Sequence, residues 1–213
     1  SVDSYGYLHL KYRTSTISYP TIHEGDNVLL LSPVQFFYLG DKERISTLRN
    51  TRPGFGFEDL GILELNTTSY ISEQSSGKTI TYDVTNLLER FFTTDQEFRY
   101  EIWPNCLPFA VKKEQLNGCT INIEFSEKTN TILLLNGFVD LYRPYLYKQN
   151  SRIRTLTITG VDAAFEKKYI LEDIVQFQKI DFPIPCSKIR ITIDDFYYGE
   201  KYTDVCLSGI APV

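Results

Sequence analysis

The chain contains 213 residues, carries a formal net charge of −5, and is 14% aromatic. Its Lys and Arg residues are scattered, so no basic tract indicates a nucleic-acid-binding protein and no cationic amphipathic helix indicates a membrane surface. The longest apolar runs, such as "VLLL" at 28–31, are far too short to cross a bilayer. We therefore expect neither a nucleic-acid partner nor a membrane span.

Residues 1–63 contain apolar segments typical of strands at 6–14, 27–40 and 60–65. The stretch at 49–60, "RNTRPGFGFEDL", is rich in Gly, Pro and charge and predicts a loop or linker. We interpret 1–63 as a small N-terminal β unit, SH3-like in kind, packed ahead of a larger domain. The alternative is that the same strands complete an edge of that domain.

Alternation of apolar and polar residues dominates 64–213, as in half-buried antiparallel strands. It predicts strands at 120–125, 152–161, 167–173, 177–182 and 188–196. Turn sequences separate them at 127–130, 162–166, 183–187 and 197–201. One short helix is predicted at 84–92, with Asp83 or Thr85 as its cap. The fold class is therefore all-β, with two packed antiparallel sheets forming a sandwich over 64–213.

The C-terminal stretch 194–210, "DDFYYGEKYTDVCLSGI", raises a conflict of parity. Continuing the alternation that turns Ile193 inward would bury Asp195, which cannot sit unpaired in an apolar core. We therefore expect a bulge or bend at Asp194–Asp195. After the turn at Gly199, the returning strand should place three residues in the core: Val205, Leu207 and Ile210.

Four cysteines are present, Cys106, Cys119, Cys186 and Cys206, and none lies in a CxxC pair, which excludes zinc-ribbon and thioredoxin-like interpretations. The chain begins at Ser1 and contains no Met, which we interpret as the mature part of an exported protein. In an oxidising compartment we expect the disulfides Cys106–Cys119 and Cys186–Cys206, each closing a hairpin. The alternative is four buried thiols, because free Cys packs well in apolar cores.

Sequence patterns for catalysis are missing. The histidines are His9 and His23, and nothing in their spacing supplies the orienting group that a catalytic triad or metal site needs. The glycine-containing stretch at 54–61 does not follow a convincing strand or open a helix, so it does not predict a phosphate loop. The paired carboxylates Asp194–Asp195 and Glu172–Asp173 are adjacent in sequence and point to opposite faces of a strand. We expect no enzyme, no cofactor and no metal.

Two C-terminal motifs carry a resemblance to a known family. "NGFVDLYRPYLYKQNSRIRTLTI" (136–158) and "FQKIDFPIPCSKIRITIDDFYYGEKYTDVCLSGI" (177–210) resemble the NADase-type glycan-binding domain, a discoidin-like, coagulation-factor type C-like domain of bacterial exported proteins. Weaker similarities at 82–90, at Trp103 and at 118–125 extend the resemblance over about 64–213. It implies a jelly-roll sandwich whose loops at one end bind carbohydrate, in a module that does not itself hydrolyse NAD.

The sequence departs from the family pattern in segments that form ligand-side loops in the family. Glu89–Arg90 replaces the family's Asp-Gly, an insert follows at 91–102, and the stretch after Trp103 does not match. Neither sugar specificity nor a structural calcium ion is carried over. The scaffold follows from the resemblance more directly than the site does.

The loop at 140–152, "DLYRPYLYKQNSR", combines aromatic rings, which stack on sugar C–H faces, with charged and amide groups for sugar hydroxyls. If this loop and the turn at 197–201 lie at the same end of the sandwich, both can line one cleft with Trp103. The predicted ligand-binding residues are Trp103, Tyr142, Arg143, Tyr145, Tyr147, Asn150, Arg152, Tyr197 and Tyr198. The alternative for each Tyr is a structural role, with its ring packed on the sheet.

The hypothesis from sequence is a non-enzymatic module that binds a glycan or glycoprotein, in a secreted, periplasmic or outer-surface bacterial protein. The alternative is a protein–protein interaction or assembly domain of a cell-envelope protein, which a large apolar patch on a sheet face would favour. An enzyme ranks third and would need two carboxylates converging in a pocket.

Overall fold

The computed structural model describes residues 3–12, 14–19, 21–24, 27–31, 36–39, 61–89, 107–140 and 143–212. Strands predominate among them and the helices are short, which confirms the all-β fold class. The predicted linker at 49–60 and the insert at 91–102 lie outside the described residues, as do Trp103, Cys106 and Tyr142.

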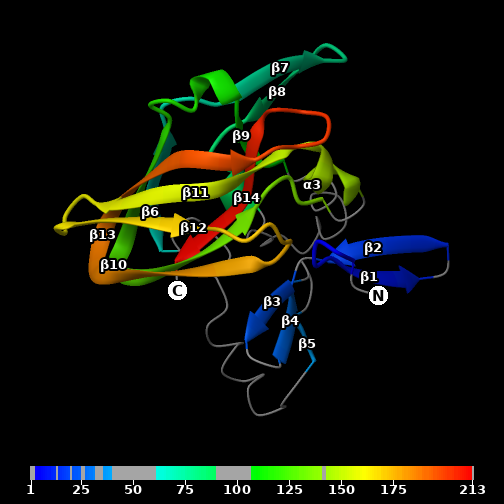
Figure 1. The fold of residues 1–213 in the computed structure, drawn as a ribbon, viewed down its shortest axis with the longest axis horizontal. Coiled ribbons are helices and arrows are strands. Elements are labelled where there is room, and N and C mark those ends of the chain that lie inside the picture. The colour runs from blue at the N-terminus through cyan, green and yellow to red at the C-terminus, as the bar shows by residue number, and fades with distance from the viewer. Residues whose placement is uncertain are drawn as a thin grey trace.

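A seven-stranded sheet, antiparallel except for one pairing, forms the body of the molecule (Figure 1). Its strands are β6 (Ile62–Thr67), β9 (Phe109–Val111), β10 (Thr120–Asn136), β11 (Ser151–Gly160), β12 (Phe165–Ile170), β13 (Phe177–Tyr197) and β14 (Val205–Pro212). They follow the order β12-β11-β13-β10-β14-β9, with β6 added on β10. A parallel pairing of β11 with β14 closes the arrangement on itself, as expected for the predicted jelly-roll sandwich.

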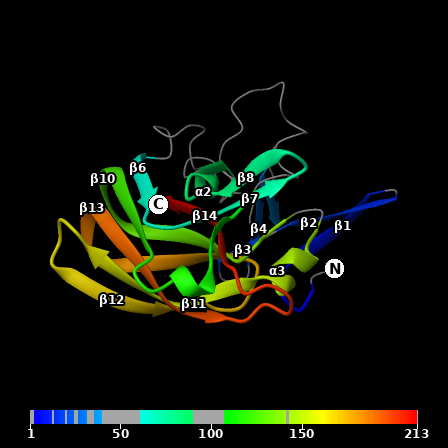
Figure 2. The same ribbon diagram turned by 90° about the horizontal axis from the view of Figure 1, so that it is seen from above.

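The long strands β10 and β13 run through both layers of the sandwich. The C-terminal half of β10 pairs with the N-terminal half of β13, and β14 pairs with the same half of β10. The N-terminal half of β10 pairs with the C-terminal half of β13, and this pair is flanked by β6 next to β10 and by β11 next to β13. The register between them shifts around Thr129, which lies opposite Cys186. The turns predicted at 127–130 and 183–187 are therefore wrong: both segments are bends within continuous strands, at which the chain passes from one layer to the other. Figure 2 shows the curved course of β10 and β13 from above.

The predicted irregularity at Asp194–Asp195 is confirmed. Leu156 lies opposite Ile193 and Thr155 opposite Asp195, so Asp194 is skipped in the register. This bulge turns Asp195 outward, where it pairs with Arg154 at the surface. The inward alternation thus stops at Ile193, because a bulge costs less than burying a carboxylate without a partner.

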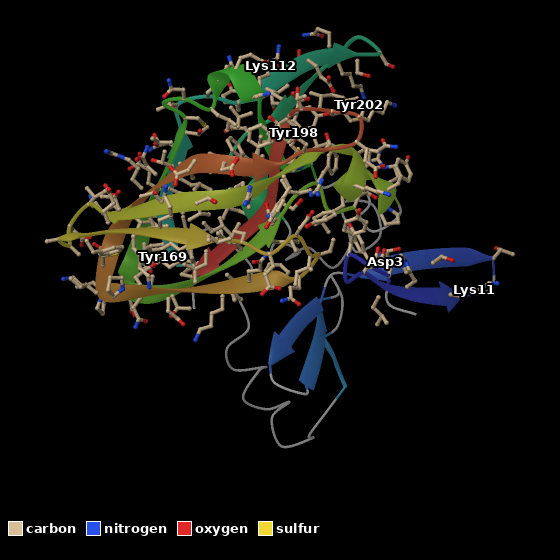
Figure 3. The ribbon with its side chains drawn as sticks, viewed as in Figure 1. Asp3, Lys11, Lys112, Tyr169, Tyr198 and Tyr202 are labelled. Atoms are coloured by element: carbon tan, nitrogen blue, oxygen red, sulfur yellow. The ribbon has the colours of Figure 1, made fainter. Side chains whose placement is uncertain are left out.

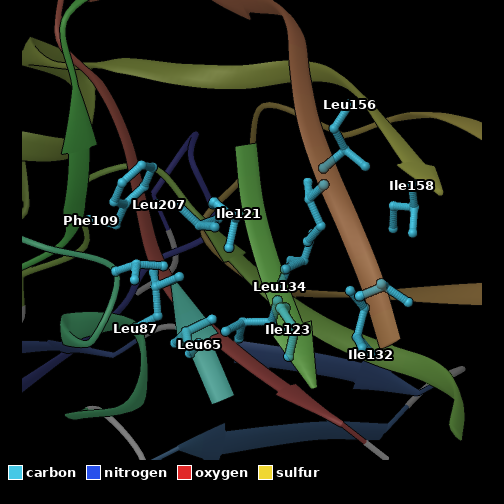
Figure 4. Packing of buried hydrophobic residues seen from close by; sticks show 14 of the residues in the cluster. Leu65, Leu87, Phe109, Ile121, Ile123, Ile132, Leu134, Leu156, Ile158 and Leu207 are labelled. Atoms are coloured by element: carbon cyan, nitrogen blue, oxygen red, sulfur yellow. The ribbon is translucent and has the colours of Figure 1, made fainter. Parts of the chain in front are cut away.

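The core fills the space between the two layers (Figure 4). Along β10, Ile121 and Ile123 are buried while Asn122 between them is partly exposed, which is the period of two expected of a half-buried strand. Burying each large aliphatic side chain contributes about 1.5–3 kcal/mol, so this cluster is the main source of stability. The predicted core positions on β14 are confirmed, since all three are at most 1% exposed: Val205, Leu207 and Ile210.

Shorter elements surround the sandwich. The predicted helix at 84–92 appears as α2 (Asn86–Glu89), and the Asp83 carboxylate accepts a hydrogen bond from the Val84 N–H just before it. A hairpin of β7 (Ile71–Ser75) and β8 (Lys78–Tyr82) and the 3-10 helix η2 (Lys113–Gln115) were not predicted from the sequence. The hairpin lies at the end of the sandwich where the β13–β14 connection turns (Figure 1).

The N-terminal strands form two small sheets. β1 (Leu8–Tyr12) pairs with β2 (Ser15–Tyr19), while β3 (Thr21–Glu24), β4 (Asn27–Leu31) and β5 (Phe36–Leu39) make a separate three-stranded sheet. The segment just before β1 packs on the sandwich, because Tyr7 is 1% exposed and lies in one buried cluster with Tyr147 and Val175. The domain boundary at 63/64 remains a prediction, and any shortened chain would have to replace this contact.

Three of the four cysteines are described, and all three are buried free thiols: Cys119, Cys186 and Cys206. The predicted Cys186–Cys206 bridge is therefore wrong. Cys186 lies opposite Thr129, whereas Cys206 lies opposite Arg152, whose other neighbour is Tyr197. From position 186 to position 197 β13 extends up to about 36 Å at ~3.3 Å per residue, while a disulfide needs Cα atoms about 4.4–6.8 Å apart. Cys119, the predicted partner of Cys106, is likewise a free thiol.

Asp162 fastens the β11–β12 turn to β13. Its carboxylate accepts hydrogen bonds from the Ser187 hydroxyl at 2.7 Å and from the backbone N–H groups of Ser187 and Lys188, both at 3.0 Å. These hydrogen bonds favour the charged form and lower the pKa of Asp162 from 3.8 to about 2. Because the folded pKa is depressed, the stabilisation is present above pH 3.8 and is lost as the pH falls through about 2.

We predict that the Ser187→Ala variant raises the pKa of Asp162 toward 3.8, because it removes the hydroxyl hydrogen bond that lowers this pKa most. An NMR pH titration that follows the side-chain carboxyl carbon of Asp162 measures this directly. The same titration of Asp194, which does not contact Ser187, serves as the internal control. An Asp162 pKa that is the same in the variant and in the original chain would contradict this account.

Candidate functional site

The two loops singled out in the sequence lie at the same end of the sandwich (Figure 1). The first contains α3 (Tyr145–Gln149), and the second connects β13 to β14 over 198–204. Backbone hydrogen bonds join them: the Glu200 N–H donates to the Lys148 carbonyl at 3.1 Å, and the Tyr202 N–H donates to the Gln149 carbonyl at 2.8 Å. The loops therefore form one continuous surface with a fixed backbone.

Gly199 allows the 198–204 loop to pack directly against the backbone at the end of α3. A Cβ atom at this position would collide with backbone atoms of Gln149, Asn150 and Tyr202. Ser151 completes the junction, since its hydroxyl accepts a hydrogen bond from the Gly199 N–H at 3.1 Å and donates to the Tyr202 carbonyl at 3.2 Å.

A buried ion pair supports this surface from below. The Arg152 guanidinium donates to both carboxylate oxygens of Asp173, and the Nε–Oδ1 distance is 2.8 Å. The Arg152 side chain is 6% exposed and that of Asp173 is 29% exposed. Tyr147 joins the pair, because its hydroxyl donates to Asp173 at 3.1 Å and its ring lies 5.1 Å from the guanidinium. Arg152 also donates to the backbone carbonyls of Asn150 and Tyr198, so a single side chain links both loops.

The electrostatics of this network follow from its burial. Burial alone would lower the pKa of Arg152, but its hydrogen bonds with the Asp173 carboxylate raise the pKa above the ordinary value. Burial, followed by the nearby Asp173 charge, raises the pKa of Tyr147. Both groups therefore keep their ordinary protonation states across the physiological range.

Three of the predicted ligand-binding residues are interior. Tyr147 is fully buried, Arg152 is 5% exposed and Asn150 is 7% exposed. Asn150 ends α3, and its amide donates to the Leu146 carbonyl at 2.9 Å. These side chains have little surface to offer a ligand, and we assign them the role of holding the loops in place.

Arg143 is partly exposed and is anchored by a buried carboxylate. Its side chain is 46% exposed, whereas that of Asp140 is 1% exposed, and the Nη2–Oδ2 distance between them is 2.8 Å. The Asp140 N–H donates in turn to the Tyr7 hydroxyl at 3.3 Å. The segment before β1 thus reaches the base of the candidate site, because Tyr7 and Tyr5 both pack edge-on against Tyr147.

The exposed side chains of the two loops form what we call the loop-end surface. Its aromatic members are Tyr145 at 54% exposed, Tyr198 at 65% and Tyr202 at 40%. Figure 3 shows Tyr198 and Tyr202 at the same end of the molecule, near Lys112. The loop-end surface comprises Arg143, Tyr145, Lys148, Tyr198, Glu200, Lys201 and Tyr202.

The predicted tyrosine pair at 197–198 divides between two sides of β13. The Tyr197 hydroxyl donates to the Leu171 carbonyl at 3.0 Å, on the side of the β12–β13 connection. Tyr198 turns toward η2, where Lys113 lies 5.0 Å from its ring and donates to its hydroxyl at 3.3 Å. Tyr197 therefore belongs to the packing of the sandwich, whereas Tyr198 stays on the loop-end surface.

Lys201, Tyr202 and Asp173 were not among the residues that the sequence predicted for the site. Lys201 lies 4.9 Å from the Tyr202 ring, directly after the Gly199 turn, and it could have been found from the same aromatic stretch that indicated Tyr197 and Tyr198. Asp173 carries no such signal, since it follows a different strand and meets Arg152 only in the folded chain.

His9 has the orienting partners that the sequence did not reveal. Its Nε2 lies 3.0 Å from the Asp3 carboxylate and its Nδ1 lies 2.7 Å from the Ser18 hydroxyl. This arrangement contains the residue types of a hydrolytic triad, but Ser18 is 2% exposed, so its hydroxyl is inaccessible to a substrate. The chain of hydrogen bonds ties the β1–β2 hairpin to the segment that carries Tyr7.

No group of three or more His, Cys, Asp or Glu side chains that could hold a metal ion occurs among the described residues. No helix in the same part of the chain is long and apolar enough to span a membrane.

Residues 115–212 match the family described as "NAD glycohydrolase translocation F5/8 type C domain". The resemblance noted in the sequence is thus confirmed over this segment, which contains both C-terminal motifs and both loops of the loop-end surface. A search of curated protein sequences finds no match.

Solved structures of similar fold include carbohydrate-binding modules. The family 32 module of NanJ from C. perfringens, solved with galactose, is 11% identical, with a TM-score of 0.40 over 70% of this chain and 91% of its own. The C-terminal domain of a chitobiase from Bacteroides fragilis is 12% identical, with a TM-score of 0.38 over 72% and 95%. A module from a family 31 glycoside hydrolase of Clostridium perfringens is 11% identical, with a TM-score of 0.37 over 71% and 96%.

Proposed function

We propose that this chain is a glycan-binding module of an exported bacterial protein, and that the glycan contacts the loop-end surface. The observation that carries the proposal is the presence of three exposed tyrosines on two loops whose backbones are joined by hydrogen bonds. Exposed tyrosine rings can stack on the C–H faces of sugars, and a backbone that is already ordered lowers the entropic cost of binding.

Polar partners for sugar hydroxyls surround these rings. Arg143 offers N–H groups that its two hydrogen bonds to Asp140 Oδ2 leave unused, and the Lys148–Glu200 pair, 2.7 Å apart, offers both a donor and an acceptor. The charges are held by partners within the protein, so they keep their positions when a neutral sugar replaces water. The module has no catalytic role in this proposal.

An assembly domain is less well supported by the exposed surface. Large aliphatic side chains that are exposed in the described part of the chain come from four separate elements: Leu63 on β6, Val161 in the β11–β12 turn, Ile170 on β12 and Ile184 on β13. The edge strand β12 also carries Lys167 and Lys168, and lysines on an edge discourage strand addition.

The whole chain applied to a glycan array tests the proposal. We expect binding to a defined group of glycans, and we expect the double substitution Tyr145→Ala with Tyr202→Ala to abolish that binding. The melting temperature should change little, because surface substitutions of this kind usually alter stability by no more than about 0.5 kcal/mol each.

Tyr169→Ala is the matched control. Tyr169 is also a partly exposed tyrosine beside a lysine, but it lies on β12, away from the loop-end surface (Figure 3). Its substitution should leave glycan binding intact. Binding that survives in the double variant, or that is lost in the Tyr169 variant, would place the ligand elsewhere.

Arg143→Ala would be a poorer test than its exposure suggests. Removing the guanidinium deletes two hydrogen bonds to Oδ2 of the buried Asp140 carboxylate. A loss of about 1–3 kcal/mol in the free energy of unfolding is therefore expected, and any loss of binding would be mixed with loss of structure.

A further inference from the structure

Cations at the loop end are held in two different ways. Arg143 and Lys148 each have a carboxylate partner, Asp140 and Glu200 respectively, at 2.8 and 2.7 Å. Lys201 has no carboxylate within ion-pair distance among the described residues, and its ammonium lies 4.9 Å from the centre of the Tyr202 ring. A hydrogen bond with the Tyr202 side chain is the main cause that raises the pKa of Lys201, and the nearby Tyr145 also raises it.

Lys113 repeats this arrangement on the other side of the 198–204 loop. Its ammonium lies 5.0 Å from the ring of Tyr198 and 5.8 Å from that of Phe196. It too has no carboxylate partner within ion-pair distance in the described part of the chain, and its hydrogen bond goes to the Tyr198 hydroxyl.

The two modes of holding a cation differ in what they leave for a ligand. A carboxylate cancels the charge of its partner, so little remains to attract a second anion. An aromatic ring attracts the cation through its quadrupole and restricts where it lies, yet it carries no net charge. Lys201 and Lys113 are thus positioned without being neutralised, each beside an exposed tyrosine.

From this difference we infer that the loop-end surface, together with the adjoining Lys113 on η2, selects anionic glycans, with the sugar ring against an exposed tyrosine and its carboxylate or sulfate group paired with Lys201 or Lys113. The inference rests on the proposed function and specifies the class of sugar. The chain as a whole is acidic, with a net charge of −5. The selection of an anionic sugar is therefore local to these two lysines and does not depend on a large basic patch.

Lactose, 3′-sialyllactose and 3′-sulfolactose test this inference, because they differ in the presence and kind of the negative group. Titration of the whole chain should show binding to at least one of the charged sugars about tenfold or more tighter than to lactose. That ratio corresponds to a single charge-assisted hydrogen bond. The advantage should shrink with added salt, which screens exposed charges.

Variants that remove the charge of a lysine show which residues cause the preference for charged sugars. Lys201→Gln combined with Lys113→Gln should bring the affinity for the charged sugar down to that for lactose. Lys167→Gln is the matched control, since Lys167 also lies 4.9 Å from a tyrosine ring, that of Tyr169, but on β12. It should not alter either affinity, and melting curves confirm that all variants are folded.

The possible outcomes distinguish failure of the anionic preference from failure of the proposed function. Equal binding of lactose and of both charged sugars would overturn the anionic preference while leaving a glycan-binding module. Persistence of the preference in the double lysine variant would overturn the assignment to Lys201 and Lys113. Absence of binding to these three sugars and to every other glycan on an array would overturn both proposals.

Discussion

Replacing Arg152 with Ala is expected to lower the free energy of unfolding by about 3–5 kcal/mol, because it leaves the Asp173 carboxylate without its bidentate partner in a largely buried site. The same substitution deletes the hydrogen bonds to the carbonyls of Asn150 and Tyr198, so both loops lose their common support. Chemical denaturation, with the midpoint and the slope fitted separately, measures the change.

Arg154 provides a control two residues further along the same strand. It pairs with Asp195 at 3.3 Å, but its side chain is 55% exposed and that of Asp195 is 51% exposed. Exposed ion pairs contribute little, so Arg154→Ala should cost less than about 1 kcal/mol. Losses of similar size for the two arginines would show that the Arg152–Asp173 pair does not support the fold.

Substituting Gly137 with Ala is expected to destabilise the chain by about 2–5 kcal/mol, for two reasons that add. Gly137 has φ +79°, which L-residues rarely adopt, and a Cβ there would lie 2.5 Å from Tyr147 Cε2 and 2.6 Å from Arg152 Cγ. The loop after β10 passes so close to this network that only a glycine fits without displacing one of the two side chains.

Gly118 separates the two causes, because it also has a positive φ, +86°, but a Cβ there would meet nothing within 4 Å. Gly118→Ala should therefore cost only the backbone strain, about 1–2 kcal/mol. Thermal unfolding of both variants gives the difference, which reports on the packing around Tyr147 and Arg152. Equal losses would mean that these side chains move aside without cost.

The fold could be predicted largely because its strands obey a period of two. Ile121 and Ile123 share one face, and the conflict at Asp195 indicated the bulge correctly. The turns predicted at 127–130 and 183–187 failed because Pro, Asn and charged residues also occur where a long strand bends between layers. Local composition cannot distinguish a bend from a chain reversal, since the difference lies in which strands pair afterwards.

The sequence indicated two loops that the structure brings together, because aromatic and polar residues gather at 140–152 and 194–204. It did not indicate which of their side chains are buried. It could not distinguish buried Tyr147 from exposed Tyr145, which are two residues apart in a short helix, because burial depends on Asp173 and Tyr7 from distant segments. For the same reason Arg152, which resembles a ligand contact in the sequence, is a structural residue.

An NMR titration shows whether a ligand contacts the loop-end surface. Backbone amide shifts of the whole chain would be followed while a glycan selected from an array is added. We predict that the largest changes occur at 143–149 and 198–204, with β12 and β6 unaffected. Changes centred on the β12 edge or on a sheet face, with both loops unchanged, would contradict the account.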